Sequence, residues 1–173
     1  MRRGNWEQAA EICEKSFKLN PRSSGTAHFT GLIYERMRRY EEAVDWFDRA
    51  LSIEADEIWP QFGKVRVHYL SNGNTEKARA LLETLPPHRF NDYWWILNGM
   101  LERNFQGVLG RLDSLSYDVA EGEYFNFYKH LAYAIVYHAL NNQALVKTHA
   151  EVARIVLEEA LREHPEDSRI HTS

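Results

Sequence analysis

Eight histidines and one cysteine are the side chains of this 173-residue sequence that most readily bind metals or act as nucleophiles. A helical metal pair needs its histidines three or four residues apart, so that both rings reach one ion. His130 and His138 are eight residues apart, and His138 and His149 fall on different expected helices. The spacing therefore predicts no metal site.

A catalytic nucleophile would need an adjacent base or a sharp turn that exposes it. Cys13 instead falls on an apolar stripe, where a free cysteine behaves as a small buried hydrophobe. The sequence contains neither a G-x-S-x-G turn nor a glycine-rich phosphate loop. We therefore predict that the protein is not an enzyme and needs no cofactor.

Three arginines, Arg36, Arg38 and Arg39, cluster at an expected turn between two helices. One interpretation is a solvated helix end, because cations are favoured near a helix C-terminus. The other is an anchor for an acidic peptide. The sequence leaves both open.

Aromatic side chains are dense in the segment that begins near Phe90. We expect most of them to pack in the core. Trp94 and Trp95 are adjacent, however, and adjacent residues of a helix point in different directions. If one packs inward, the other is available to a partner-binding groove or a neighbouring subunit, where tryptophan is a common anchor.

The elements that must position these side chains repeat along the chain. Five positions recur after 34 residues, first as Trp6, Ala9, Cys13, Ser16 and Pro21, then as Tyr40, Ala43, Phe47, Ala50 and Ala55. A third copy lies 35 residues further on, as Thr75, Ala78, Leu82 and Leu85. Each copy places small and bulky apolar residues on one stripe of a helix. The alternation of sizes predicts closely packed pairs of helices.

This pattern resembles the tetratricopeptide repeat, whose signature is W-x2-L-G-x2-Y followed by A-x3-F-x2-A and a closing proline. The second copy carries the matching residues Gly31, Tyr34, Ala43, Phe47 and Ala50. It departs from the signature at four positions, Ala27, Thr30, Arg38 and Ala55. The resemblance implies an all-α fold, a right-handed α-solenoid of about nine stacked helices.

We expect one domain over residues 1–173, composed of repeats and two partial repeats. The expected boundaries are 5–21 for a half repeat, 24–55, 56–87, 90–116 and 123–165 for four repeats, and 166–173 for the start of another or a tail. The fourth repeat is compressed, and Asp92 is a plausible cap for its first helix. Ser116–Gly122 is expected to be a loop, followed by one helix over Glu123–Leu140.

The resemblance also implies a concave surface, lined by the first helix of each repeat, that binds a peptide or a partner's helix. The residues expected on it are His28, Leu32, Glu35 and Arg36, then Lys64 and Val67, with Trp94 and Trp95 as further anchors. Chaperone-binding members clamp a terminal carboxylate with lysine and asparagine. Here those positions hold His28, Leu32, Gly63 and Val67, so that clamp is not expected.

The composition is that of an ordinary globular protein, with 27% charged and 44% hydrophobic residues. The net charge of −4 predicts no nucleic-acid partner. No apolar run approaches the roughly 20 residues that span a bilayer, and no apolar stretch follows the first arginines. We expect a cytoplasmic protein without membrane insertion, which also fits a single cysteine.

The leading hypothesis is a non-catalytic scaffold that binds a protein or peptide in its groove. The alternative is a self-association or regulatory module of a larger bacterial signalling protein, with a possible homodimer through the open repeat ends. The long last pair and the closing HPEDSRIH are similar to repeat regions beside the catalytic or DNA-binding domains of some bacterial kinases, cyclases and transcription regulators.

Overall fold

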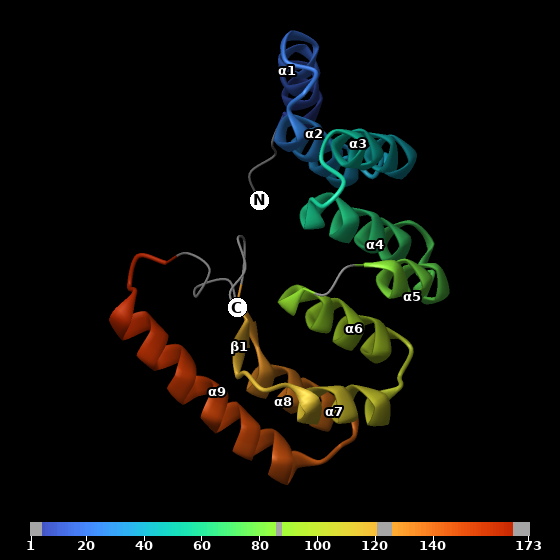
Figure 1. The fold of residues 1–173 in the computed structure, drawn as a ribbon. Helices are drawn as coiled ribbons and strands as arrows, with labels where there is room; N and C mark the ends of the chain where they lie inside the picture. The colour runs from blue at the N-terminus through green and yellow to red at the C-terminus, as the bar shows by residue number, and fades with distance from the viewer. Residues whose placement is uncertain (1–4, 86–87, 121–125, 168–173) are drawn as a thin grey trace. The chain divides into compact units, whose positions relative to one another are not determined.

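The computed structural model describes residues 5–85, 88–120 and 126–167 (Figure 1). These residues form nine α-helices and one pair of two-residue strands. The predicted all-α helical-repeat fold is therefore confirmed. The residues gather into two compact units, of which the first ends at Leu85. The expected single domain stays a prediction, because two compact units can still unfold together.

Unit 1 contains five helices, which run from blue to yellow-green in Figure 1. They are α1 (Trp6–Leu19), α2 (Ser24–Arg36), α3 (Tyr40–Ile53), α4 (Ile58–Asn72) and α5 (Thr75–Thr84). Consecutive helices pack on one another, and α4 also contacts α2. The first helices of two successive pairs, α2 and α4, therefore lie side by side.

Polar side chains fix where three of these helices begin. Asn5, Ser23 and Asn74 cap α1, α2 and α5, and each accepts a hydrogen bond from the backbone N–H three residues on. Such a cap satisfies one of the N–H groups that the first turn leaves unpaired.

Phe47 of α3 is the centre of the unit 1 core and is fully buried. Its ring lies between Gly31 of α2 and Gly63 of α4. A Cβ added at Gly31 would lie 2.5 Å from the ring, and one at Gly63 would lie 2.6 Å from it. Gly31, which was expected at a close helix contact, and Gly63, which was not, thus make room for one aromatic ring that joins three helices.

Unit 2 contains four helices and a short β-ribbon. Its elements are α6 (Arg89–Leu101), α7 (Phe105–Ser114), β1 (Val119–Ala120), β2 (Phe127–Tyr128), α8 (Lys129–Ala139) and α9 (Gln143–Glu163). The strands pair antiparallel, with Val119 opposite Tyr128. α9 has 21 residues and α8 has 11, so the second half of α9 extends beyond its partner.

Two expectations for the chain between α7 and α8 are corrected. The loop over Ser116–Gly122 contains β1, and the helix expected from Glu123 begins at Lys129, after β2. Pairing of the strands satisfies backbone groups and buries Ala120, which a helical pattern does not reveal. Residues 121–125 lie outside the described residues, as do 168–173, where a further repeat was expected to continue.

Asp92 does not cap α6. The helix begins three residues earlier, after His88, whose Nδ1 accepts a hydrogen bond from the Phe90 N–H at 3.1 Å. Asp92 instead accepts hydrogen bonds from Arg111 at 2.9 Å and from the Tyr117 hydroxyl at 2.7 Å. It therefore ties α6 to the chain that follows it.

In each helical pair, the turn between the two helices contains a residue with a left-handed backbone conformation. Arg38, Gly73, Arg103 and Asn141 have φ values of 61°, 67°, 58° and 58°. They separate α2 from α3, α4 from α5, α6 from α7 and α8 from α9. The turn geometry therefore recurs in both units, although only one of the four residues is the glycine that this conformation favours.

Candidate partner-binding surface

The expected groove residues of α2 divide between its exposed and buried sides. Arg36 is exposed and Leu32 is half-buried, whereas His28 and Glu35 are buried. α2 packs against α1, α3 and α4, so only one stripe of its surface is left for solvent. That stripe contains Phe29, Leu32 and Arg36, at the i, i+3 and i+7 spacing of one helix face.

An ion pair joins the buried side of α2 to α4. Arg66 donates from Nε and Nη2 to Oε2 of Glu35, at 2.8 and 2.6 Å. The Glu35 side chain is almost fully buried, whereas the Arg66 side chain remains 31% exposed. Arg66 therefore lies on the side of α4 that faces α2.

Leu70 follows Arg66 by one helical turn, so it lies on the same side of α4. It is 49% exposed, and Phe29 on α2 is 50% exposed. Phe29, Leu32 and Arg36 of α2 and Arg66 and Leu70 of α4 are exposed or half-buried residues of these two neighbouring helices, and we call this set the α2–α4 face. Phe29, Arg66 and Leu70 were not among the residues expected in the groove, although their helical spacing could have suggested them.

The two groove residues expected on α4 have other contacts. Lys64 pairs with Asp48 of α3 at 2.6 Å, so it lies on the side of α4 toward the second helix of the preceding pair. Val67 is buried in the unit 1 core. A role for either side chain in partner binding stays a prediction.

His28 lies beneath the α2–α4 face and is 6% exposed. In the described part of the chain, neither of its ring nitrogens has a hydrogen-bond partner. Burial and the positive charge of Arg66 lower its pKa from 6.5 to about 4. His28 is therefore neutral at pH 7, and its ring packs 5.7 Å from the ring of Phe47.

The three clustered arginines have different contacts. Arg39 donates from Nε to Glu42 at 2.8 Å, and its guanidinium lies 4.6 Å from the centre of the Tyr34 ring. Arg38 occupies the left-handed turn position. Within the described residues, Arg36 makes no hydrogen bond or ion pair through its side chain. Arg36 is thus free to meet an acidic group.

Trp94 and Trp95 belong to unit 2. Trp94 is buried, and Trp95 is partly exposed, with the Arg111 guanidinium 5.2 Å from its ring centre. One tryptophan of the pair thus packs inward and the other reaches the surface. Partner binding by either stays a prediction.

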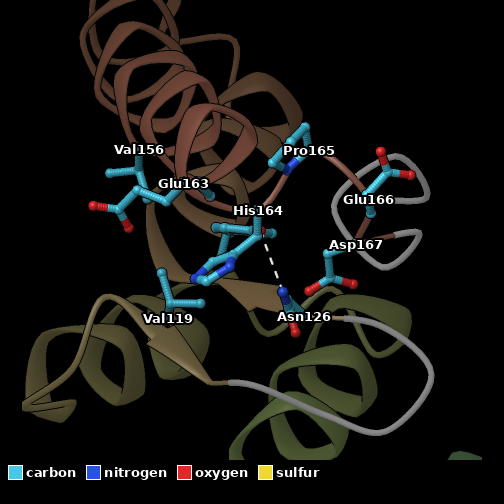
Figure 2. A pocket seen from close by; sticks show the side chains of 10 residues that line it. Val119, Asn126, Val156, Glu163, His164, Pro165, Glu166 and Asp167 are labelled. Carbon is cyan, nitrogen blue, oxygen red and sulfur yellow. Dashed lines mark hydrogen bonds between the residues drawn. The ribbon is translucent and has the colours of Figure 1, made fainter.

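Unit 2 also contains a cleft of about 780 Å³ between the ribbon and the end of α9 (Figure 2). Val119 and Tyr128 of the ribbon line it, together with Val156 of α9. Glu163 and Glu166 lie at its rim and are exposed to solvent. Carboxylates that water already solvates gain little from a ligand, so the cleft indicates no particular chemistry.

A smaller pocket of about 280 Å³ lies between α6, β2 and α8. Its lining is aromatic and aliphatic and includes Tyr93, Phe127 and Ile135, with the Asn126 amide as a polar group. Its volume is just below the range typical of small-molecule sites.

One contact between histidines was not predicted from the sequence. His130 of α8 and His149 of α9 lie 2.9 Å apart between their Nδ1 atoms. The His149 ring also stacks 4.5 Å from the ring of Tyr133. Burial and the neighbouring His130 lower the pKa of His149. The contact joins two helices, so spacing within one helix could not reveal it.

The part of the chain that the structure describes holds no cluster of three or more histidine, cysteine, aspartate or glutamate residues arranged to bind a metal. None of its helices combines the length and apolar character needed to cross a bilayer. Burial raises the pKa of Cys13, which favours its thiol over the nucleophilic thiolate.

The fold and its surface define a helical-repeat protein with an exposed, partly apolar face. Residues 26–57 match the tetratricopeptide repeat family. The match covers the pair α2–α3, which supplies most of the α2–α4 face. It supports the resemblance found in the sequence.

A segment of 85 residues is 31% identical to anaphase-promoting complex subunit 3 of Schizosaccharomyces pombe. The segment is 49% of this chain and spans 13% of the relative's length. The similarity concerns a fraction of that larger protein.

Proposed function

We propose that the protein is a non-catalytic protein-binding module and that the α2–α4 face contacts its partner. The proposal rests on exposed Phe29 and half-buried Leu32, one turn apart on α2, and on exposed Leu70 of the neighbouring α4. Bulky apolar side chains at a surface typically anchor a protein interface. Tetratricopeptide repeats generally mediate protein–protein interactions. The relative's name, that of a subunit of a complex, is in keeping with such a role.

Site-specific photocrosslinking tests the proposal. A photoreactive phenylalanine analogue is placed at Phe29 or Leu70, and at Glu83 on α5 as an exposed control. The first two positions should crosslink to the same protein in cells of the native host, and Glu83 should not. Adding Leu32→Arg should abolish the crosslink from Phe29. Equal labelling from all three positions would refute a role for this face.

Self-association is a second candidate, favoured by the outer surface of α1. Trp6 and Ile12 of α1 are exposed large apolar side chains. Such a helix could pair with a second copy of the chain, as a regulatory module of a larger, bacterial-type signalling protein would require. Sedimentation at micromolar concentration tests this, with Trp6→Lys as the variant that should dissociate a dimer. A wild-type monomer would eliminate the candidate.

A further inference from the structure

We propose that the segment recognised by the α2–α4 face carries an acidic side chain flanked by bulky apolar ones. This inference rests on the proposed function and specifies the chemistry of its partner. The apolar part of the face consists of Phe29, Leu32 and Leu70. Its charged part consists of Arg36 and Arg66.

The α2–α4 face has an excess of positive charge, although the whole chain carries −4. Arg66 uses two nitrogens on Glu35, and a guanidinium has five N–H donors, so some of its donors remain for another acceptor. Arg36 has no partner among the described residues. Of the two guanidinium groups, only that of Arg66 has a carboxylate partner, and that carboxylate is buried.

Among the described residues, no contact at this end of α2 supplies a carboxylate to Arg36. Glu54, which accepts a hydrogen bond from the Ser24 hydroxyl at 2.7 Å, lies at the opposite end of α2. The helix rise of 1.5 Å per residue puts about 18 Å between Ser24 and Arg36. An incoming carboxylate can therefore bind Arg36 without displacing an existing ion pair.

His28 lies on the buried side of α2 and is uncharged at pH 7. Burial and, second, the charge of Arg66 lower its pKa. A neutral imidazole does not repel the arginines, as a protonated one would. His28 therefore adds no repulsion to the two arginines, and the apolar residues of the face would exclude water around a bound anion.

A protein segment fits this surface better than a nucleic acid. Nucleic-acid binding usually requires a row of cations that contacts successive phosphates, and its affinity comes mainly from those contacts. The α2–α4 face offers only Arg36 and Arg66, on a chain of net charge −4. Its arginines and apolar side chains instead match a peptide in which one carboxylate lies between apolar side chains.

The test is selection of a random dodecapeptide phage library on the full chain, followed by affinity measurements on the selected synthetic peptides. Selected peptides should combine aspartate or glutamate with leucine, phenylalanine or tryptophan. Their affinity should fall about tenfold with Arg36→Glu, partly recover with Arg36→Lys, and stay unchanged with Lys15→Glu on exposed α1. It should also weaken between about 50 mM and 500 mM sodium chloride.

The outcomes separate this inference from the proposed function. If the selected peptides are neutral or basic and lose binding with Leu32→Arg, the acidic character of the partner is refuted, whereas the role of the α2–α4 face in binding is supported. Selected peptides that are indifferent to both Leu32→Arg and Arg36→Glu would overturn both. Binding of single-stranded oligothymidylate with Arg36 dependence, in place of acidic peptides, would identify a nucleic acid and refute the inference.

Discussion

His28 is the buried polar side chain whose protonation most directly affects the stability of unit 1. Its two nitrogens lack partners in the described structure, and protonation would place a charge beside Arg66. A buried polar group without a hydrogen bond costs about 1–3 kcal/mol. The buried imidazole therefore lowers the free energy of unfolding.

Acid should destabilise the folded protein through His28. Its pKa is about 4 in the folded chain and near 6.5 when unfolded, so the unfolded chain binds more protons between these values. The neutral ring's contribution is complete above about pH 6.5 and is lost as the pH falls toward 4, by about 3 kcal/mol. Urea unfolding followed by circular dichroism at several pH values measures the loss.

His28→Leu removes this dependence, because leucine does not titrate. The variant should be about 1 kcal/mol more stable at pH 7 and should lose less stability than the parent toward pH 4. His138→Gln, at an exposed position, should follow the parent. Parallel pH curves for His28→Leu and the parent would contradict the assigned role.

At the scale of elements, the four helical pairs share a left-handed turn residue but differ in how well the sequence suits it. Gly73 adopts φ 67° without strain, whereas Arg38 and Arg103 carry side chains at φ 61° and 58°. A left-handed conformation costs a residue with a side chain about 1–2 kcal/mol. The departure of Arg38 from the turn glycine of the repeat signature therefore has an energetic consequence.

Arg38→Gly should stabilise unit 1. Relief of the turn conformation should exceed the extra backbone entropy of glycine, for a net gain of about 0.5–1 kcal/mol. Thermal unfolding followed by circular dichroism measures it. Lys15→Gly, within α1, should instead destabilise by about 1 kcal/mol. Equal losses from both substitutions would show that the turn is unstrained.

Gly63→Ala should destabilise the contact of α4 with α3 by about 1–3 kcal/mol. The added methyl meets the Phe47 ring, which cannot retreat because Gly31 lies against its other side. Combining Gly63→Ala with Phe47→Leu should cost less than the sum of the two changes. A methyl group added at Gly25 meets open space, so Gly25→Ala should stabilise α2 slightly. If the losses of stability from Gly63→Ala and Phe47→Leu are additive, the Phe47 ring does not lie against Gly63.

At the scale of the whole molecule, the described residues form two units, each with its own buried apolar residues. In unit 1 the buried cluster includes Ala27, Ala43, Phe47, Ala50 and Val67. In unit 2 buried residues come from both the helices and the ribbon. Neighbouring helices rather than distant ones therefore provide most of the packing, as in repeat proteins.

Residues 1–85 should fold as an isolated fragment, because the Phe47 cluster lies wholly within them. A cooperative thermal transition with a helical circular dichroism spectrum is expected. A fragment of residues 1–53 lacks Gly63 and Val67, leaves one side of Phe47 uncovered, and should melt at a lower temperature. If residues 1–85 show no cooperative transition while the full chain does, the units depend on each other.

The helical pairs of unit 1 and their contact faces can be predicted from residue types and spacing alone. Ala43, Phe47 and Ala50 are buried as their spacing predicts, and Gly31 leaves the expected room. These features follow from helical periodicity and side-chain size, which depend on residues near one another in the chain. The short ribbon escaped prediction because it depends on pairing between segments.

The contacts between side chains of different helices could not be predicted in this way. Glu35 pairs with Arg66, Lys64 with Asp48, and His130 with His149. Such contacts depend on the rotation and offset of one helix against another. Side-chain packing over the whole interface sets those quantities, and a repeat period of 34 residues does not specify them.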